Sequence, residues 1–257
     1  MELTKREKAY LEFYKGENIE EALYEWKGEL SFHEKGFYLV QLTSGKINAF
    51  LNFLNNPKDS TLASLDVYKL DMILMMIMTL SEVACKCALE DVDTSGKPLY
   101  RYEHQDNIES YDKEYLCGFK STSYSCEAVE AFNDGEKPLL EFYMNGFCPY
   151  IPVNKLTNQG MLNDEHECLF PPYINCHING NNIDLYLDEQ NDLYDIKAFD
   201  EAEKSFVEQL NEDKKNGVVS DKLKEYCKHI NAFLKYSIKS LYQKYNNIYN
   251  ENKESIK

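Results

Sequence analysis

The central part of the chain, from residue 99 to residue 187, alternates short apolar runs with polar turns. Runs of this kind, rich in aromatic and β-branched residues and bounded by turn residues, are typical of β-strands. Helical patterns lie before and after them, and helices and strands in separate blocks predict an α+β fold. We expect strands at residues 99–103, 116–121, 139–144, 148–152, 166–170, 173–178 and 183–187.

Helices are expected where apolar residues recur at intervals of three or four positions. Before the strands this spacing marks residues 4–14, 19–27, 44–55 and 65–89, and residues 37–42 fit either a strand or a helical turn. Ser44 is a candidate N-cap for its helix. After the strands the spacing marks residues 202–210 and 221–249, and residues 250–257 are expected to be a frayed tail.

The most apolar segment, residues 70–88, is interrupted by Ser81, Glu82 and Lys86. A membrane-spanning helix needs about 20 consecutive apolar residues, so we expect a buried helix instead. The N-terminus shows no apolar stretch of a secretory signal. We therefore expect no membrane partner, and either a cytoplasmic location or delivery into a host cell.

The charge balance is strongly acidic, with a formal net charge of −16 over 257 residues. Nucleic-acid binding depends on clustered Lys and Arg, so we expect no nucleic-acid partner. The 8 cysteines are scattered and form no repeated C-x₂₋₄-C unit of a zinc site. We expect reduced thiols and no metal.

Two carboxylates, Glu165 and Glu167, are separated by one residue just before a short apolar run. In a strand, residues two apart project from the same face, so both carboxylates would share one space, with His166 and Cys168 on the other face. Like charges in one site repel. The alternative is a solvated strand edge that carries surface charge.

Two further motifs lie upstream of this pair, namely Arg101 at the start of the strand region and Ser121-Thr122-Ser123 at the end of a later strand. The ordered set of a strand Arg, a Ser-Thr-Ser strand and a Glu-x-Glu strand resembles the arginine-specific class of ADP-ribosyltransferases. Residues 46–51 look like the family's Ile-Asn-x-x-Leu helix. Phe132 looks like its aromatic residue over the nicotinamide. The resemblance covers roughly residues 40 to 190.

The resemblance implies an ADP-ribosyltransferase-like split two-sheet fold with NAD as substrate. Residues 1–200 would form the enzyme domain, with a helical lobe at 1–92 and a strand-rich catalytic core at 97–190. Residues 201–257 would be a helical extension packed on or beside this domain. Bacterial toxins and effectors are a common setting for such enzymes, and a host or cellular protein would be the acceptor.

The resemblance also assigns roles to residues. Glu167 would stabilise the positive charge that develops on the ribose when nicotinamide leaves. Ser121 would brace Glu167, and Arg101 would hold the pyrophosphate through bidentate contacts. Phe132 would lie against the nicotinamide ring. Glu165 would bind and deprotonate the acceptor, which favours arginine.

The remaining NAD-binding positions are Tyr102, Thr122 and Ser123. Tyr102 departs from the family, which commonly has Gly directly after the strand Arg. Residues 154–163, which resemble the acceptor-recognition loop, have no aromatic residue at their tip. Two alternatives stay open, namely an NAD glycohydrolase without a specific acceptor and a non-catalytic binding module with the same fold.

Overall fold

The computed structural model describes residues 3–15, 43–67, 70–90, 97–103, 114–133, 135, 137–156, 166–189 and 193–255. The chain forms two compact units. The sheet unit comprises Met1–Leu3, Ser81–Gln190 and Lys239–Lys257, and the helical unit comprises Thr4–Leu80 and Asn191–Ile238. Helices α6 (Leu70–Glu90) and α11 (Asp221–Ser255) contribute residues to both units.

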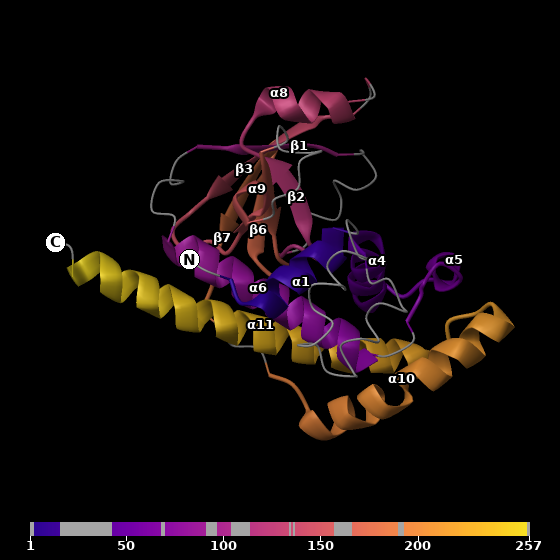
Figure 1. Ribbon diagram of the computed structural model, residues 1–257. Coiled ribbons are helices and arrows are strands. Elements are labelled where there is room, and N and C mark those ends of the chain that lie inside the picture. Colours follow the sequence, from indigo (N-terminus) through magenta and orange to yellow (C-terminus); the bar gives the residue numbers. More distant parts are fainter. Residues whose placement is uncertain are drawn as a thin grey trace. The chain divides into compact units, whose positions relative to one another are not determined.

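The strands of the sheet unit form one seven-stranded sheet in the order β4-β5-β2-β1-β3-β7-β6. Figure 1 labels β1, β2, β3, β6 and β7 of this sheet. Neighbouring strands are antiparallel except β3 and β7, which are parallel. The strands are β1 (Leu99–Tyr102), β2 (Lys120–Ser123), β3 (Leu139–Met144), β4 (Ile151–Pro152), β5 (Glu167–Phe170), β6 (Asn175–Asn179) and β7 (Asn182–Tyr186). The mixed helix-and-strand class is confirmed. The division into two sheets is not, because the described strands join in one.

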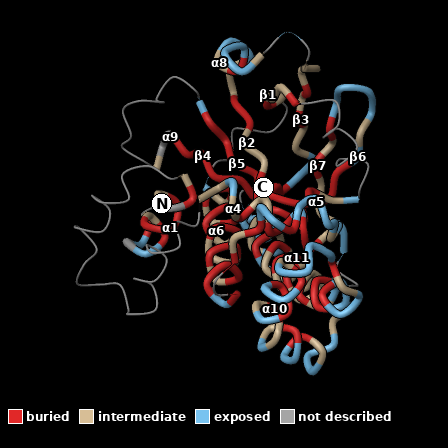
Figure 2. Tube along the Cα trace, turned by 90° about the vertical axis from the view of Figure 1, so that its right-hand side faces the viewer, coloured by how far each residue is buried: buried red, intermediate tan, exposed pale blue. Residues whose placement is uncertain are grey.

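The two faces of the sheet differ in polarity. Leu99, Phe142 and Ile183 lie opposite one another on three neighbouring strands, and all three are fully buried. Tyr100, which follows Leu99, is paired with Ser123, and Ser123 lies opposite Glu167. Because successive residues of a strand alternate between faces, these polar residues share the other face. Figure 2 shows β4 and β5 as buried and the turn between β6 and β7 as exposed, and β2 is half buried.

The strand predictions differ most from the structure at β2, β4 and β6. β4 begins at Ile151 rather than at residue 148. β3 has the expected bounds, but β2 begins at Lys120 rather than at residue 116. The N–H of Leu116 donates to the Ile174 carbonyl, and the N–H of Tyr173 donates to the Leu116 carbonyl, so this segment pairs outside β2. Tyr173 has a φ of 65°, which places it in a turn, and β6 begins only at Asn175.

The described helices confirm several expected segments and correct others. α4 has the expected bounds, but its N-cap is Thr43 and not Ser44. α10 is longer than expected because the Asp195 carboxylate accepts from the first N–H groups and Gly217, with a φ of 69°, ends the helix. α11 continues to Ser255, so the frayed tail expected from residue 250 is wrong over 250–255. Besides α6 and α11, the α-helices are α1 (Lys5–Lys15), α4 (Ser44–Asn55), α5 (Asp59–Leu62), α8 (Cys126–Val129), α9 (Val153–Leu156) and α10 (Ile196–Asn216).

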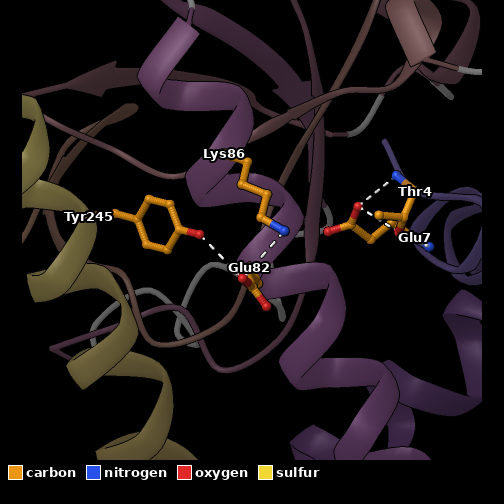
Figure 3. Close-up of polar contacts among 5 residues, drawn as sticks. All are labelled: Thr4, Glu7, Glu82, Lys86 and Tyr245. Atoms are coloured by element: carbon orange, nitrogen blue, oxygen red, sulfur yellow. Dashed lines mark hydrogen bonds and ion pairs between the residues drawn. The ribbon is translucent and has the colours of Figure 1, made fainter. Parts of the chain in front are cut away.

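Two expected elements lie outside the described residues, namely the helix at 19–27 and the segment at 37–42. Inside the helical unit, the Phe50 ring of α4 meets the Phe206 ring of α10 edge-on at a centroid distance of 6.0 Å. At the start of α1, Thr4 donates from its N–H and hydroxyl groups to Glu7 (Figure 3). This unit is held mainly by helix-on-helix packing.

The end of α11 packs into the sheet unit. Tyr242 is 1% exposed, and its hydroxyl donates to the Pro172 carbonyl at 2.7 Å. The Tyr245 hydroxyl donates to Glu82 of α6 at 3.2 Å, and Lys86 lies 3.3 Å from the same carboxylate (Figure 3). Burial and the nearby Glu82 raise the pKa of Tyr245 to about 12. The end of α11 therefore supplies part of the core of the sheet unit.

α6 is long and apolar enough to cross a membrane by length and composition, with a mean hydropathy of 1.8 over its most apolar window. In the structure, 67% of that window is buried inside the protein. The burial agrees with the expected core helix.

Candidate functional site

β2 lies between β1 and β5, so the sheet brings together the three motifs that are far apart in the sequence. Tyr100 of β1 is opposite Ser123 of β2, and Ser123 is opposite Glu167 of β5. Ser121 is two residues from Ser123 and therefore projects from the same face as Glu167. The strand register thus places the Ser-Thr-Ser segment beside the last carboxylate of the Glu-x-Glu motif.

Glu167 is a buried carboxylate, with 6% of the residue exposed. The Ser121 hydroxyl donates to its Oε1 atom at 2.7 Å. Burying an ionisable group is unfavourable unless it is hydrogen-bonded, and Ser121 supplies such a bond. The bond also fixes the direction in which the carboxylate points.

Arg101 is held by one acceptor directly after β1 and one in β2. Its Nε atom donates to Glu103 Oε2 at 2.8 Å, and its Nη1 atom donates to the Ser121 carbonyl at 2.8 Å. The Lys120 ammonium lies 3.9 Å from the same Glu103 oxygen. Burial lowers the pKa of Lys120, and the charge of Glu103 opposes that shift. A buried carboxylate therefore lies between two cations.

The segment after β2 forms α8 and the 3₁₀ turn η2 (Glu130–Phe132), which lie beside β1 in Figure 1. The Ser125 hydroxyl caps α8 by accepting from the Ala128 N–H. The Ser123 hydroxyl accepts from the Ser125 N–H at 3.0 Å. The last Ser of the Ser-Thr-Ser strand thus fixes the start of this short helix.

A second contact ties the same segment to β1. The Tyr102 hydroxyl donates to Glu130 Oε2 at 2.7 Å, and Asn133 donates to Oε1 at 3.2 Å. The hydrogen bond with Glu130 raises the pKa of Tyr102, and the bond from Tyr102 lowers the pKa of Glu130. Phe132, two residues on, is 54% exposed. The turn therefore presents an aromatic ring to solvent from a position anchored to β1.

These elements surround a pocket of about 290 Å³ within the sheet unit. Small-molecule sites usually have volumes of roughly 300–1,000 Å³, so the pocket lies just below the lower end of this range. It has a buried carboxylate, cationic side chains and an exposed aromatic ring in its wall. The lining residues are Tyr100, Arg101, Tyr102, Glu103, Ser121, Thr122, Ser123, Val129, Phe132, Lys137 and Glu167.

Most of the residues predicted for the site line this one pocket. Thr122 also serves the sheet, because its hydroxyl donates to the Cys168 carbonyl at 2.9 Å. Glu165 lies outside the described residues, as does most of the predicted acceptor loop. His166 has a φ of 49° and precedes β5. The strand expected to begin at His166 therefore begins at Glu167, and strand alternation no longer places Glu165 beside Glu167.

The sequence motifs did not identify Glu103 or Lys137 as lining residues. Glu103 is two positions after Arg101 in an extended segment, so the two-residue period could have placed both on one face. Lys137 belongs to the loop before β3, where no periodic pattern exists. Its ammonium donates to the Phe132 carbonyl at 3.4 Å.

A search of the described residues for metal ligands finds no group of three His, Cys, Asp or Glu side chains arranged to hold an ion. His166 is exposed, whereas Cys168 is fully buried in β5. Burial raises the pKa of the Cys168 thiol well above its usual value. These two neighbours in sequence have very different surroundings.

Comparisons with known proteins were made for the whole chain. No family model matches it. No curated protein matches its sequence. The chain is similar to the crystal structure of the ADP-ribosyltransferase Vis in complex with agmatine, with 15% sequence identity and a TM-score of 0.30, over 72% of this chain and 85% of that chain.

Proposed function

We propose that this protein is an NAD-dependent mono-ADP-ribosyltransferase that transfers ADP-ribose to a protein side chain. The observation that carries the proposal is the single pocket that joins Arg101, Ser121, Phe132 and Glu167. The motifs of the ADP-ribosyltransferase resemblance are spread along the sequence. The strand order brings Arg101, Ser121 and Glu167 together, and the turn η2 adds Phe132 to the same pocket. A chance likeness of short motifs would not require such convergence.

Glu167 is proposed to act on the ribose of NAD. Loss of nicotinamide leaves positive charge on the sugar, as in glycoside hydrolysis through an oxocarbenium-like state. A fixed carboxylate aimed at that charge lowers the barrier because its orientation needs no change during the reaction. The hydrogen bond from Ser121, at 2.7 Å, supplies this fixed orientation.

The rest of the pocket is proposed to bind the other parts of NAD. Arg101 carries a planar guanidinium that suits the pyrophosphate oxygens. The exposed ring of Phe132 suits the cationic nicotinamide ring. Tyr102 anchors the turn that carries Phe132 by its bond to Glu130, and Ser123 anchors the start of α8, which leads into that turn. Thr122 lines the pocket between the two serines.

The acceptor is proposed to be an arginine of a cellular protein, with Glu165 as the residue that binds it. A carboxylate pairs with a guanidinium through two parallel hydrogen bonds and can help to remove its proton. Glu165 precedes the exposed His166. This part of the proposal depends on the Glu-x-Glu resemblance alone.

The test uses labelled NAD with a cell lysate and, separately, with agmatine as a small guanidine. We expect label on protein and on agmatine, and Glu165→Gln should reduce both transfers more than it reduces nicotinamide release. Glu127→Gln, an exposed carboxylate of α8 outside the pocket lining, is the matched control. Nicotinamide release without transfer to any acceptor would instead identify an NAD glycohydrolase.

A further inference from the structure

Glu103 is buried at the wall of the pocket, although no sequence motif singled it out. The residue is 3% exposed and lines the pocket beside Arg101. A buried carboxylate is costly unless it is paired and hydrogen-bonded. Its cationic neighbours are Arg101 at 2.8 Å and Lys120 at 3.9 Å.

The contacts around Arg101 define the plane of its guanidinium. Glu103 binds Nε, and the Ser121 carbonyl binds Nη1, each at 2.8 Å. A side chain held at two atoms by acceptors on different segments has little freedom to rotate. Two hydrogen bonds at different nitrogen atoms restrain rotation more than either does alone, so Glu103 helps to fix the plane.

We propose that Glu103 is a positioning residue, which orients the Arg101 guanidinium so that it receives a pyrophosphate group in the pocket. This inference extends the proposed function, because the pyrophosphate would be that of NAD. Glu103 acts through Arg101 and takes no part in bond breaking. The Glu103 carboxylate would itself repel a pyrophosphate. It can favour binding only if the orientation of Arg101 contributes more than this repulsion costs.

Orientation and electrostatic repulsion therefore predict opposite changes in anion binding when Glu103 loses its charge. Arg101, Lys120 and Glu103 together carry a net charge of +1, which Glu103→Gln raises to +2. Even if Lys120 then loses its proton, the net charge does not fall below +1. Electrostatics alone therefore predicts that Glu103→Gln binds an anion as tightly as the wild type or more tightly. Glu103→Gln leaves the Arg101 Nε atom a neutral amide acceptor in place of a charged one, so this hydrogen bond loses the attraction between opposite charges and is weaker. The weaker hold on the guanidinium therefore predicts weaker binding.

The experiment measures Kd for NAD and for inorganic pyrophosphate in four full-length proteins: wild type, Glu103→Gln, Arg101→Lys and the double variant. Removing the partner that orients a ligand-binding side chain costs roughly 10- to 100-fold in the comparable case of metal sites. We expect Glu103→Gln to weaken both ligands about tenfold. In the Arg101→Lys background it should have no further effect, because coupled residues are not additive.

Two controls separate positioning from stability. Asp213→Asn changes another buried carboxylate, 2% exposed, which accepts hydrogen bonds from Gln209 and Ser220 outside the pocket lining. It should lower the unfolding temperature and leave both Kd values unchanged. If Glu103→Gln does not fold, Glu103→Asp keeps the charge, shortens the side chain and should also weaken pyrophosphate binding.

The inference is overturned if Glu103→Gln binds pyrophosphate as tightly as the wild type, or more tightly. It is also overturned if the loss is equally large in the Arg101→Lys background, or if wild type binds neither ligand. If wild type binds pyrophosphate but does not bind NAD, the proposed function is wrong. The expected pyrophosphate Kd values of the four proteins would still support the role of Glu103.

Discussion

The Glu167 carboxylate is almost completely buried and accepts a hydrogen bond from Ser121 at 2.7 Å. A hydrogen bond to a charged group contributes about 1.5–3 kcal/mol. In the proposed reaction this contact matters most when positive charge develops on the ribose, since the carboxylate must then already be in place. The effect of Ser121 should therefore appear in turnover more than in binding.

We predict that Ser121→Ala lowers kcat for nicotinamide release about 10- to 100-fold, which is the rate equivalent of that hydrogen-bond energy. The KM for NAD should change by less than about threefold. Steady-state kinetics with labelled NAD measures both constants. Ser64→Ala, an exposed serine of the helical unit, serves as the control and should leave both unchanged. An effect of Ser121→Ala on KM alone would contradict the assignment.

At the scale of the elements, the sheet and the α8–η2 segment meet through side chains rather than through strand pairing. The Tyr102–Glu130 bond ties β1 to the turn that carries Phe132. The arginine-specific ADP-ribosyltransferases that the sequence resembles commonly have Gly at the position of Tyr102. Here the Tyr102 hydroxyl makes the contact with Glu130, and Tyr102 lines the pocket.

Tyr102→Phe removes only the hydroxyl, and we predict that it weakens NAD binding a few fold because Phe132 is held less firmly. The matched control is Tyr143→Phe, whose hydroxyl likewise donates to a neighbouring carboxylate, Glu141, outside the pocket lining. Titration of NAD binding measures both variants. Equal Kd values for the two variants would show that the Tyr102–Glu130 bond does not position Phe132.

Local sequence patterns predicted some helices and strands and missed others. The bounds of α4 and β3 follow from apolar periodicity and turn residues, and both were predicted correctly. α8 and η2 are too short for a periodic pattern, and the start of α8 is held by the Ser125 hydroxyl and by the Ser123 hydroxyl of β2. The sequence pattern predicted a strand from His166, but His166 has a left-handed backbone and β5 begins at Glu167. The alternation of side chains carries no information about φ, so this pattern could not predict the difference.

At the scale of the whole molecule, the chain crosses between its two units more than once. The sheet unit contains Ser81–Gln190 and also Lys239–Lys257. The order of helical and strand patterns predicted the mixed class, but no local signal shows that the last helix returns to the sheet unit. That return depends on long-range contacts such as those of Tyr242 and Tyr245.

Because the end of α11 belongs to the sheet unit, we predict that a chain ending at residue 238 loses both stability and NAD binding. It would lack Tyr242, which is buried and hydrogen-bonded to Pro172, and the ring of Tyr249, whose centroid lies 5.5 Å from that of Phe147. Burying one large side chain contributes about 1.5–3 kcal/mol. Thermal unfolding with and without NAD measures the effect.

A chain ending at residue 250 is the control, because residues 251–255 are exposed, and it should unfold at the wild-type temperature. An unchanged unfolding temperature and Kd in the chain ending at residue 238 would instead support an independent domain over residues 1–200.

Nicotinamide release from labelled NAD by wild type and by Glu167→Gln tests the central claim most directly. Glu167→Gln keeps the shape of the side chain and an acceptor for Ser121 but removes the negative charge. We predict that wild type releases nicotinamide, and that the variant does so at least about 100-fold more slowly with an NAD Kd within about threefold of wild type. No release by wild type, or equal release by both proteins, would contradict the assignment of the pocket as an NAD-cleaving site.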